Sequence, residues 1–425
     1  MRFTFKNAYV YGVAEKTDVV IDTSAKNVTN VSVFSDNFSG NFSPVGEEFS
    51  VSKKCVIFPG FVDVHVHLRE PGFSYKETVK SGSEAAAAGG YVAVCSMPNL
   101  NPSPYSAENL KAQTDIIDRD AVIKVIPYGR ITRDGQTLSD MEEMARSVVA
   151  FSDDGVGVQT ASVMRKAMIE AKRLGKIIAA HCEDDALRNG GAIHDGKYAK
   201  EHNIAGISSE SEWKQIERDI DLVRETLCAY HVCHISTKEG VDLIRRAKAE
   251  GLNVSCETGP HYLVMDENDL IDHGNFKMNP PLRSSEDREA LIEGIRDGTI
   301  DMIATDHAPH SEEEKSKGLA GSLMGIVGLE TAFPVLYTEL VRKGVISLEK
   351  LVELLSEAPA KRFDIDTGEM LGEKASFTVF EIEDEYEINP EDFKSMGKNT
   401  PFGGKKVFGK CLMTVYDGKI VHNAL

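Results

Sequence analysis

The pattern of apolar and polar positions divides the chain into three parts. Residues 1–58 hold short runs in which apolar and polar side chains alternate, broken by Asn, Ser and Gly, with no long helical period. Such alternation is typical of strands with one buried face. The same texture returns in the tail, in runs at residues 375–380, 413–416 and 419–422. We therefore expect the segments 1–58 and 364–425 to pair in one small β domain.

Between these ends, residues 59–363 alternate compact β-rich runs with longer segments of helical period. The β-rich runs number eight and lie at residues 60–68, 91–97, 121–128, 148–152, 176–181, 230–235, 253–257 and 302–305. Eight strands interleaved with helices predict an α/β fold, a (β/α)8 TIM barrel that forms the catalytic domain. A doubly wound sheet is the alternative, but such a sheet normally carries a glycine fingerprint after its first strand, and none follows residues 60–68.

Composition narrows the class of protein. The chain has 425 residues, 41% hydrophobic and 27% charged, which excludes a disordered or fibrous chain. Its net charge of −19, without any basic block, argues against a nucleic-acid or anionic-membrane surface. No apolar run is long enough to span a bilayer, and no signal peptide opens the sequence. The seven cysteines form no CxxC pair and read as reduced thiols, so we expect a cytoplasmic protein.

Polar residues gather where the β-rich runs end, and in a parallel barrel those ends share one mouth. The first run ends in His65 and His67, which leave the same face of a strand because they are two residues apart. Two imidazoles on one face can ligate a single metal ion. The alternative is a pair of core histidines with satisfied hydrogen bonds.

Later runs end in further imidazoles and carboxylates. His181 and His234 follow the fifth and sixth runs, and Asp306 follows the eighth. Asp153 and Asp154 follow the fourth run. With the first pair, this set offers four imidazoles and two or three carboxylates but no thiolate, which suits zinc with positions left open for water. Each aspartate alone would more often be a turn or cap residue.

Several stretches of the sequence resemble a known family. They are HVHLREPG at 65–72, MPN at 97–99, KMNPPLR at 277–283, ATDHAPH at 304–310, GIVGLET at 325–331 and NTPF at 399–402. These stretches are similar to signature stretches of dihydroorotases in the amidohydrolase superfamily, and the likeness runs along nearly the whole chain. It is greatest for the bacterial type whose metal-bridging group is an aspartate, not a carboxylated lysine. The chain departs from that family at Leu323 and Met324, where relatives often carry Pro-Phe.

The resemblance implies zinc, one or two ions per subunit, held by His65, His67, Asp154, His181, His234 and Asp306. The first two histidines would bind one ion and the other two the second ion. Asp154 would bridge the ions, and it is preferred to Asp153 because its 27-residue separation from His181 matches the family. Asp306 would also transfer protons, as the catalytic residue.

The reaction implied by the resemblance is the reversible interconversion of N-carbamoyl-L-aspartate and L-dihydroorotate, a step of pyrimidine synthesis. Its implied substrate contacts are Arg69, Asn99, Asn279 and His310. A protein of charge −19 repels a carboxylate substrate, so local positive charge must override the global field, and the planar fork of Arg69 can grip a carboxylate. Arg69 could instead form a salt bridge with a neighbouring acid, Glu70 or Asp63, and Asn99 could have a purely conformational role in its turn.

Other polar residues are set aside. Glu257, Thr258 and His261 follow the seventh run and are expected to support the site without touching substrate. His307 should point to the opposite face from Asp306. Cys182 and Cys233 flank two of the histidines but fall on the opposite strand face, and we expect them to be small core residues.

Several questions stay open from the sequence. The segment 310–325, rich in Glu, Lys, Ser and Gly, could fold over bound substrate or be a plain solvated loop. A sister enzyme acting on another cyclic amide, a hydantoinase or allantoinase, would share the fold and metals. A catalytically inactive homologue serving as a structural partner of aspartate transcarbamoylase would be expected to have lost ligands, whereas all of them are present here. A homodimer and an association with aspartate transcarbamoylase are both left open.

Overall fold

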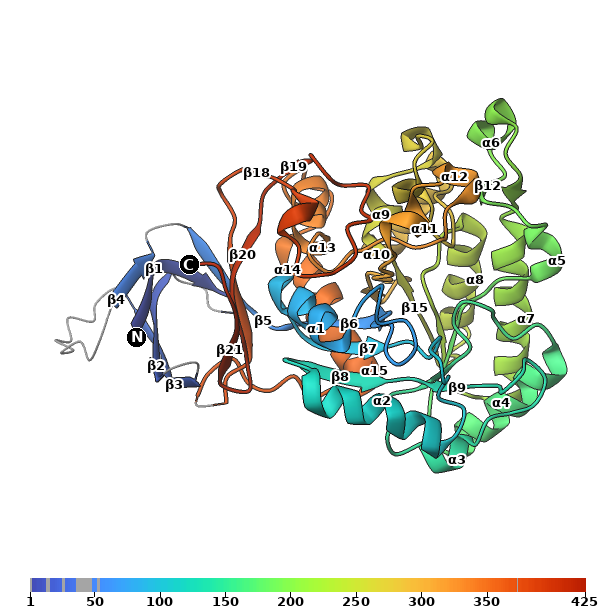
Figure 1. Ribbon diagram of the computed structural model, residues 1–425, viewed down its shortest axis with the longest axis horizontal. Coiled ribbons are helices and arrows are strands. Elements are labelled where there is room, and N and C mark those ends of the chain that lie inside the picture. The colour runs from blue at the N-terminus through green and yellow to red at the C-terminus, as the bar shows by residue number, and fades with distance from the viewer. Residues whose placement is uncertain (1, 13–15, 25–26, 36–47, 52–53, 373) are drawn as a thin grey trace.

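A computed structural model describes residues 2–12, 16–24, 27–35, 48–51, 54–372 and 374–425. Figure 1 shows a sheet that contains strands from both ends of the chain on one side, and a barrel surrounded by helices on the other. Among the described residues, no helix combines the length and the apolar character needed to cross a membrane.

The barrel strands are all parallel to their neighbours. One sheet contains β6 (Phe61–Val66), β7 (Tyr91–Ser96) and β8 (Lys124–Pro127), and a second contains β9 (Gly129–Arg130), β10 (Phe151–Ser152), β11 (Ile178–Ala180), β14 (Tyr230–Val232), β15 (Val254–Thr258) and β16 (Met302–Ile303). Only Tyr128 separates β8 from β9, and a parallel bridge between Val66 and His307 joins the chain after β16 to β6. The predicted α/β barrel architecture is therefore confirmed.

Long helices lie between successive barrel strands. They are α1 (Val79–Ala88), α2 (Ala107–Asp120), α4 (Ala161–Arg173), α7 (Glu210–Thr226), α8 (Lys238–Ala249) and α10 (Ser285–Arg296). Five of them begin after a Ser or Thr whose side-chain oxygen accepts a backbone N–H of the first turn, which satisfies a donor that the helix leaves unpaired.

Shorter elements occupy the connections. The helices are α3 (Met141–Met144), α5 (Asp185–Arg188), α6 (Lys197–His202), α9 (Pro260–Val264), α11 (Glu312–Lys315), α12 (Gly318–Gly321), α13 (Ala332–Leu336), α14 (Leu348–Val352) and α15 (Ala358–Phe363). The strands are β12 (Ile193–His194), β13 (Gly206–Ile207), β18 (Tyr386–Glu387) and β19 (Lys406–Val407). Several of these elements lie on the side of the barrel where the strands end.

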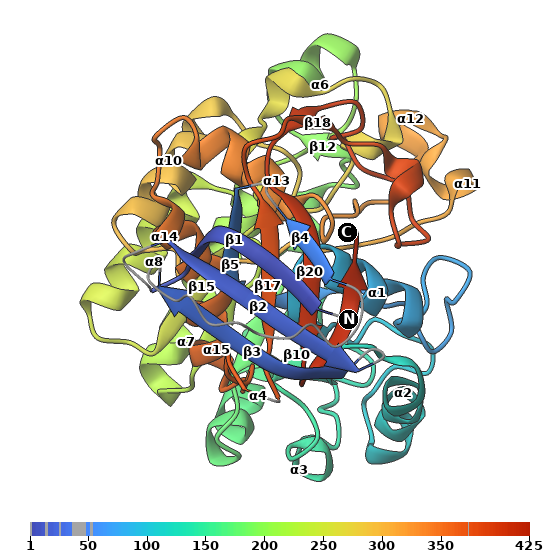
Figure 2. The ribbon, with the colours of Figure 1, turned by 90° about the vertical axis from the view of Figure 1, so that its left-hand side faces the viewer.

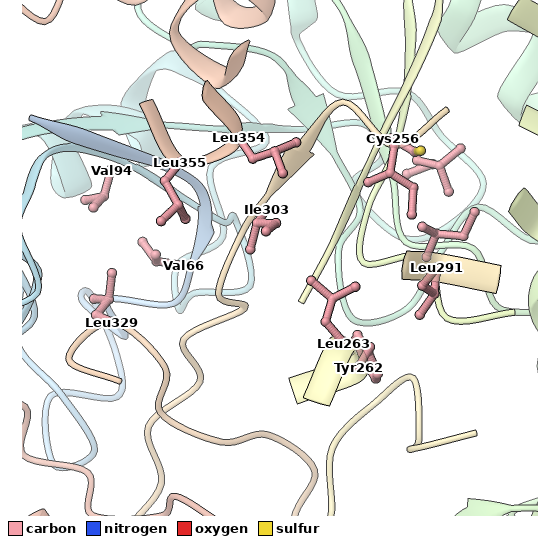
Figure 3. Packing of buried hydrophobic residues seen from close by; sticks show 14 of the residues in the cluster. Val66, Val94, Cys256, Tyr262, Leu263, Leu291, Ile303, Leu329, Leu354 and Leu355 are labelled. Atoms are coloured by element: carbon pink, nitrogen blue, oxygen red, sulfur yellow. The ribbon is translucent and has the colours of Figure 1, made fainter. Parts of the chain in front are cut away.

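The main core lies between the barrel strands and the helices. Figure 3 shows Val66 of β6 and Ile303 of β16 beside Leu354 and Leu355, which belong to a helical turn between α14 and α15. All four side chains are fully buried or nearly so. Packing of this kind fixes where each strand ends, and hence where the polar residues that follow it lie.

The second sheet joins the two ends of the chain. Its strands are β1 (Arg2–Val10), β2 (Thr17–Ser24), β3 (Asn27–Ser35), β4 (Glu48–Val51), β5 (Cys55–Pro59), β17 (Phe377–Glu381), β20 (Lys410–Tyr416) and β21 (Lys419–Asn423). They follow the order β2-β3-β21-β20-β17-β5-β1-β4, and β1 also pairs with β2 (Figure 2). Tail strands thus pair with N-terminal strands, which confirms that expectation. The domain boundaries at residues 58/59 and 363/364 stay a prediction.

Aromatic side chains connect this sheet to the barrel. The ring of Phe380 from β17 lies 4.2 Å from that of Phe333 in α13 and 5.5 Å from that of Phe61 in β6, measured between centroids. The Thr414 hydroxyl of β20 also donates to the Ala87 carbonyl of α1. The sheet is therefore packed firmly against the N-terminal side of the barrel.

Candidate metal centre and substrate cavity

Six side chains predicted as metal ligands follow or end five different strands. His65 lies in β6 and His67 just after it, while the other four follow β10, β11, β14 and β16. All six residues, His65, His67, Asp154, His181, His234 and Asp306, are buried. The barrel brings them together because the carboxyl ends of its parallel strands meet at one rim.

Asp154 lies at the centre of this cluster. Its Oδ1 is 3.3 Å from His65 Nε2 and 3.7 Å from both His181 Nδ1 and His234 Nε2. Its Oδ2 is 3.6 Å from His67 Nε2. All four histidines thus direct a ring nitrogen toward one carboxylate, a position suited to a group that bridges two cations.

Asp306 and the second histidine pair complete the cluster. Asp306 Oδ1 is 2.9 Å from His67 Nε2 and 3.4 Å from His65 Nε2. The facing nitrogens of His181 and His234 are 2.9 Å apart. Two groups, His65–His67–Asp306 and His65–Asp154–His234, each hold three ligand atoms within 4.8 Å of one another. Each group offers enough donors for one ion.

Two of the histidines are held from behind by acceptors. Glu257 Oε1 is 2.7 Å from His65 Nδ1, and Asn99 Oδ1 is 2.8 Å from His67 Nδ1. An acceptor at Nδ1 holds the ring proton there and leaves the Nε2 lone pair directed at the carboxylates. Burial opposes the ionisation of Glu257, but His231 and His65 lower its pKa, so it remains a carboxylate. Glu257, expected to support the site, contacts a predicted ligand directly.

The cluster fits a divalent cation. His65 Nε2 and Asp154 Oδ1, which face each other at 3.3 Å, are buried and lack a hydrogen-bond partner. Lone pairs that face each other repel unless positive charge lies between them. Burial disfavours charge on His65, yet Asp154 and Asp306 raise its pKa, so the carboxylates draw positive charge into this space. Imidazole and carboxylate donors without a thiolate are a set that zinc takes in proteins.

The neighbouring carboxylate, Asp153, has a different set of contacts. Its Oδ1 accepts the backbone N–H groups of Ile131 and Thr132 at 2.9 and 3.0 Å, and its Oδ2 accepts the Thr132 hydroxyl. Arg130 Nε lies 3.3 Å from Oδ1. Asp153 therefore anchors the loop after β9, and the geometry favours Asp154 as the candidate bridging group.

Three of the predicted site residues have left-handed backbone conformations. The φ angles are +62° for Arg69, +32° for His234 and +48° for Asp306. A residue with a Cβ in this region costs roughly 1–3 kcal/mol, which the surrounding packing must offset. Strain of this kind collects at functional sites, and here it turns three polar side chains toward one cavity.

The cluster opens onto a cavity of about 280 Å³. Its wall includes all four predicted substrate contacts, Arg69, Asn99, Asn279 and His310. It also includes Arg188, Leu323 and Met324, together with five members of the cluster. The candidate metal ligands and the candidate substrate-binding groups thus share one cavity.

Arg69 does not pair with its acidic neighbours. Its Nε donates to the Pro309 carbonyl at 3.2 Å, and its Nη2 lies 3.4 Å from His310 Nε2. Glu70 instead accepts the Val79 amide. Burial lowers the pKa of Arg69 to about 10, so the guanidinium remains charged at neutral pH and available on the cavity wall.

His310 is a neutral partner of Arg69. Burial, with the nearby cations Arg69 and Lys76, lowers the pKa of His310 to about 3. Its Nε2 is 2.8 Å from the Met324 carbonyl, which accepts the ring proton. The ring is therefore uncharged across the physiological range and adds shape and hydrogen bonding to the wall, not charge.

Sequence reasoning missed several residues around the cavity. Glu183 Oε2 lies 3.2 Å from Asn279 Nδ2 and 3.5 Å from His181 Nε2, so it links a candidate substrate contact to a candidate ligand. Asn399, from the tail, accepts the His310 amide and donates to the Ala308 and Gly325 carbonyls. Glu183 stands two residues after His181, a usable signal, whereas nothing in the tail indicated that it reaches the barrel mouth.

His307, Cys182 and Cys233, which were not expected to bind metal or substrate, lie outside the cavity wall, but Cys233 is closer to the cluster than expected. His307 is buried away from the cavity, where Nδ1 accepts the Gly328 amide and Nε2 lies 3.5 Å from Glu77. Cys182 and Cys233 are buried core residues. The thiol of Cys233, however, lies within 4.8 Å of ligand atoms of His65 and Glu257, closer to the cluster than its strand face suggested.

The segment 310–325 forms part of the cavity wall. It contains α11 and α12, and the buried Lys315 Nζ donates to the carbonyls of Lys277, Leu323 and Gly325 at 3.0, 2.8 and 2.7 Å. One side-chain nitrogen thus ties α11 both to Lys277, two residues before Asn279, and to the backbone around Met324. A plain solvated loop does not describe this segment.

The two adjacent aspartates give a matched test of the metal centre. We expect Asp154→Asn to lower the affinity for Zn²⁺ more than about 100-fold, because a central negative ligand is lost. Asp153→Asn should keep the metal but lower the melting temperature. The substitution replaces one of two accepting oxygens with an NH2 group, which cannot accept the hydrogen bond made there. Metal analysis after dialysis against Zn²⁺, with thermal unfolding, separates the two. Equal metal content in both variants would contradict the central position of Asp154.

The Lys315 contacts predict a second pair of variants. Lys315→Met should lower the free energy of unfolding by about 1–3 kcal/mol, because buried carbonyls lose their donor. Lys317→Met, at an exposed position two residues along, should change it by less than about 0.5 kcal/mol. Urea titration of both proteins measures the difference, and an equally stable Lys315→Met protein would show that the three contacts carry no net stability.

Comparison with known proteins places this geometry in a family. The family model described as Dihydro-orotase-like matches residues 54–240. A dihydroorotase of Fusobacterium nucleatum is 51% identical over 393 residues, which cover 91% of this chain and 92% of the relative. A dihydroorotase of Staphylococcus epidermidis is 48% identical over 415 residues, 96% of each chain.

Solved structures show the same architecture. The L-hydantoinase of Arthrobacter aurescens superposes with a TM-score of 0.82 at 25% identity, covering 99% of this chain and 96% of that one. A dihydropyrimidinase of Brevibacillus agri gives a TM-score of 0.80 at 22% identity, over 100% and 95% of the two chains. The identities to the curated relatives are about twice as high and extend over nearly the full length. The chain therefore belongs to the dihydroorotase family of amidohydrolases.

Proposed function

We propose that this enzyme uses bound zinc, one or two ions, to interconvert N-carbamoyl-L-aspartate and L-dihydroorotate in pyrimidine synthesis. The observation that carries the proposal is the buried cluster of four histidines and two aspartates that opens onto a cavity with a charged arginine on its wall. Family membership supports the substrate, because the curated relatives are named dihydroorotases.

The proposed metal ligands are the six clustered residues. His65 and His67 would hold one ion and His181 and His234 another, with Asp154 between them and Asp306 beside the first. Zinc in such a site lowers the pKa of water from 15.7 to about 7 and polarises a carbonyl oxygen. Glu257 and Asn99 would keep the first two rings oriented through their Nδ1 contacts.

Asp306 is the proposed proton carrier. Burial opposes its ionisation, but His65 and His67 lower the pKa of Asp306, so it is a carboxylate able to accept a proton. In the hydrolytic direction, the Asp306 carboxylate would take a proton from the attacking water as the new C–O bond forms at the ring carbonyl. It would return that proton to the ring nitrogen as the C–N bond breaks. The reverse sequence closes the ring.

Arg69 and its neighbours are the proposed substrate clamp. The guanidinium fork can bind a carboxylate through two hydrogen bonds, which fixes both position and orientation. Asn99, Asn279 and His310 add uncharged polar groups on the same wall. This local cation is what allows a protein of net charge −19 to bind an anionic substrate.

The solved structures with similar folds suggest one alternative activity. Hydantoinase and dihydropyrimidinase activities are those of the solved structures with the same architecture. Arg69, Asn99 and an aspartate at the candidate bridging position favour dihydroorotate over an uncharged cyclic amide. Activity toward hydantoin would be the signature of the rival.

We also propose the number of barrel strands and the domain boundaries. With β8 and β9 counted as one strand, the parallel runs would form the (β/α)8 TIM barrel over residues 59–363. Residues 1–58 and 364–425 would form the small β domain, with part of the tail reaching the barrel mouth through Asn399. The cytoplasmic location, a homodimer and association with aspartate transcarbamoylase stay predictions.

Turnover and metal content together test the function. We expect the purified enzyme to interconvert dihydroorotate and N-carbamoyl-L-aspartate, to lose activity on chelation and to regain it with Zn²⁺. Asp306→Asn should lower kcat more than about 100-fold while it keeps the fold and most of the substrate affinity, because the proton carrier is removed and the other five proposed ligands remain. Hydrolysis of hydantoin or allantoin in preference to dihydroorotate would overturn the assignment.

Arg69→Lys tests the clamp. We expect kcat/KM to fall about 100-fold, since an ammonium cannot reproduce the two parallel hydrogen bonds of the fork. Metal content should stay at the level of the unmodified enzyme. Arg119, an exposed residue that pairs with Asp120, provides the control: Arg119→Lys should leave kcat/KM unchanged. Full activity in Arg69→Lys would rule out the clamp.

A further inference from the structure

A second arginine, Arg188, lies on the wall of the substrate cavity. It is the last residue of α5, the short helix that follows His181 and Glu183 (Figure 1). Arg69 and Arg188 are the two Lys or Arg side chains among the described residues that line this cavity. Because the chain beyond α5 turns through left-handed Asn189, with φ +53°, the helix stops with the arginine at the cavity mouth.

The guanidinium of Arg188 has only weak contacts within the protein. Its Nε lies 3.5 Å from Glu183 Oε1 without forming a hydrogen bond, and its Nη2 lies 3.7 Å from the sulfur of Met324, a weak acceptor. By contrast, Arg283 donates to the Ser236 hydroxyl at 3.1 Å and to the Ile207 carbonyl at 3.0 Å. Arg283 is a structural arginine, whereas Arg188 keeps donors available for a ligand.

The nearby Glu183 forms only a long ion pair with Arg188, at 3.5 Å and without a hydrogen bond. Its other oxygen is shared between Asn279 at 3.2 Å and His181 at 3.5 Å. The side chain of Arg188 is 35% exposed and also lines the cavity, so it lies closer to the solvent than the buried Arg69 does. An anion that approaches the mouth therefore meets this cation before it reaches Arg69.

Met324 lies between the two cations. Its carbonyl accepts a hydrogen bond from His310, whose ring lies 3.4 Å from the Arg69 guanidinium, while its sulfur touches Arg188. Two residues of the wall, His310 and Met324, thus connect the two arginines. This spacing suits a small ligand with more than one negative group.

We propose that Arg188 is a second anion-binding group, which favours the ring-opened substrate over the ring-closed one. The proposal rests on the proposed function. N-carbamoyl-L-aspartate carries two carboxylates and dihydroorotate carries one, so a cation at the mouth attracts the open form more strongly. Arg69 would hold the carboxylate common to both forms, and Arg188 would contribute to the affinity for the extra charge.

Reversibility restricts how this preference can appear. The ratio of kcat/KM in the two directions equals the equilibrium constant, so any substitution must change both values by the same factor. A cation that binds the open form selectively therefore shows itself in the separate KM values and in direct binding, not in that ratio. The equal change in kcat/KM is an internal check on the measurements.

The test compares Arg188→Met with Arg188→Lys. We expect Arg188→Met to raise KM for N-carbamoyl-L-aspartate about tenfold and KM for dihydroorotate about twofold or less, with metal content unchanged. Arg188→Lys should recover most of the loss, because it keeps the charge. Added salt should raise KM for the open substrate in the unmodified enzyme and have less effect in Arg188→Met. Lys197→Met removes one exposed charge on α6 and should leave both KM values unchanged.

Two results would overturn the proposal. One is an unchanged KM for the open substrate in Arg188→Met. The other is an equal rise in both KM values with unaltered salt dependence, which would mean that Arg188 only supports the wall at Met324. Calorimetric binding of N-carbamoyl-L-aspartate to Asp306→Asn protein, with and without Arg188→Met, gives the same comparison without turnover. Failure of the unmodified enzyme to turn over either substrate would instead count against the proposed function.

Discussion

The structure depends on one electrostatic constraint, the burial of two carboxylates against four imidazoles at the rim of a barrel. Asp154 Oδ1 and His65 Nε2 face each other at 3.3 Å without a hydrogen-bond partner. Glu257 Oε1 lies 2.7 Å from Nδ1 of His65 and keeps the Nε2 lone pair of that ring directed at Asp154. Such an arrangement is stable when a cation lies in its centre, and the left-handed backbone at His234 and Asp306 is part of what maintaining it costs.

The rest of the fold serves to hold this constraint in place. Parallel strands carry the ligands, and segments farther along the chain hold part of the cavity wall in place. Lys315 fastens the backbone on both sides of Met324, and Asn399 brings the tail to Ala308 and Gly325. The tail is therefore both a partner of the N-terminal strands and a part of the barrel mouth.

Strand-end residues could be read from the sequence because periodicity locates the ends of buried strands. A spacing of two residues was enough to predict that His65 and His67 share one face of a strand. The ligands on the other strands could be predicted because parallel barrel strands end at one rim. Arg188 and Lys315 follow no such rule, because they belong to short helices whose direction is set by tertiary packing. Among adjacent acids, the choice of Asp154 over Asp153 rested on a resemblance, since turn geometry decides which carboxylate faces inward.

Charge also acts on two length scales in this molecule. A net charge of −19 spread over the surface is screened within about 8 Å at physiological ionic strength, so it discourages anions only weakly at the mouth. Inside the cavity, screening is lower and the charge on Arg69 is retained in spite of burial. A partly exposed cation such as Arg188 lies between these two environments. It can act on the approach of substrate and remain sensitive to salt, whereas the buried arginine fixes orientation and is largely insensitive to salt. Division of these tasks between two arginines lets a strongly acidic protein bind acidic substrates without a positive surface.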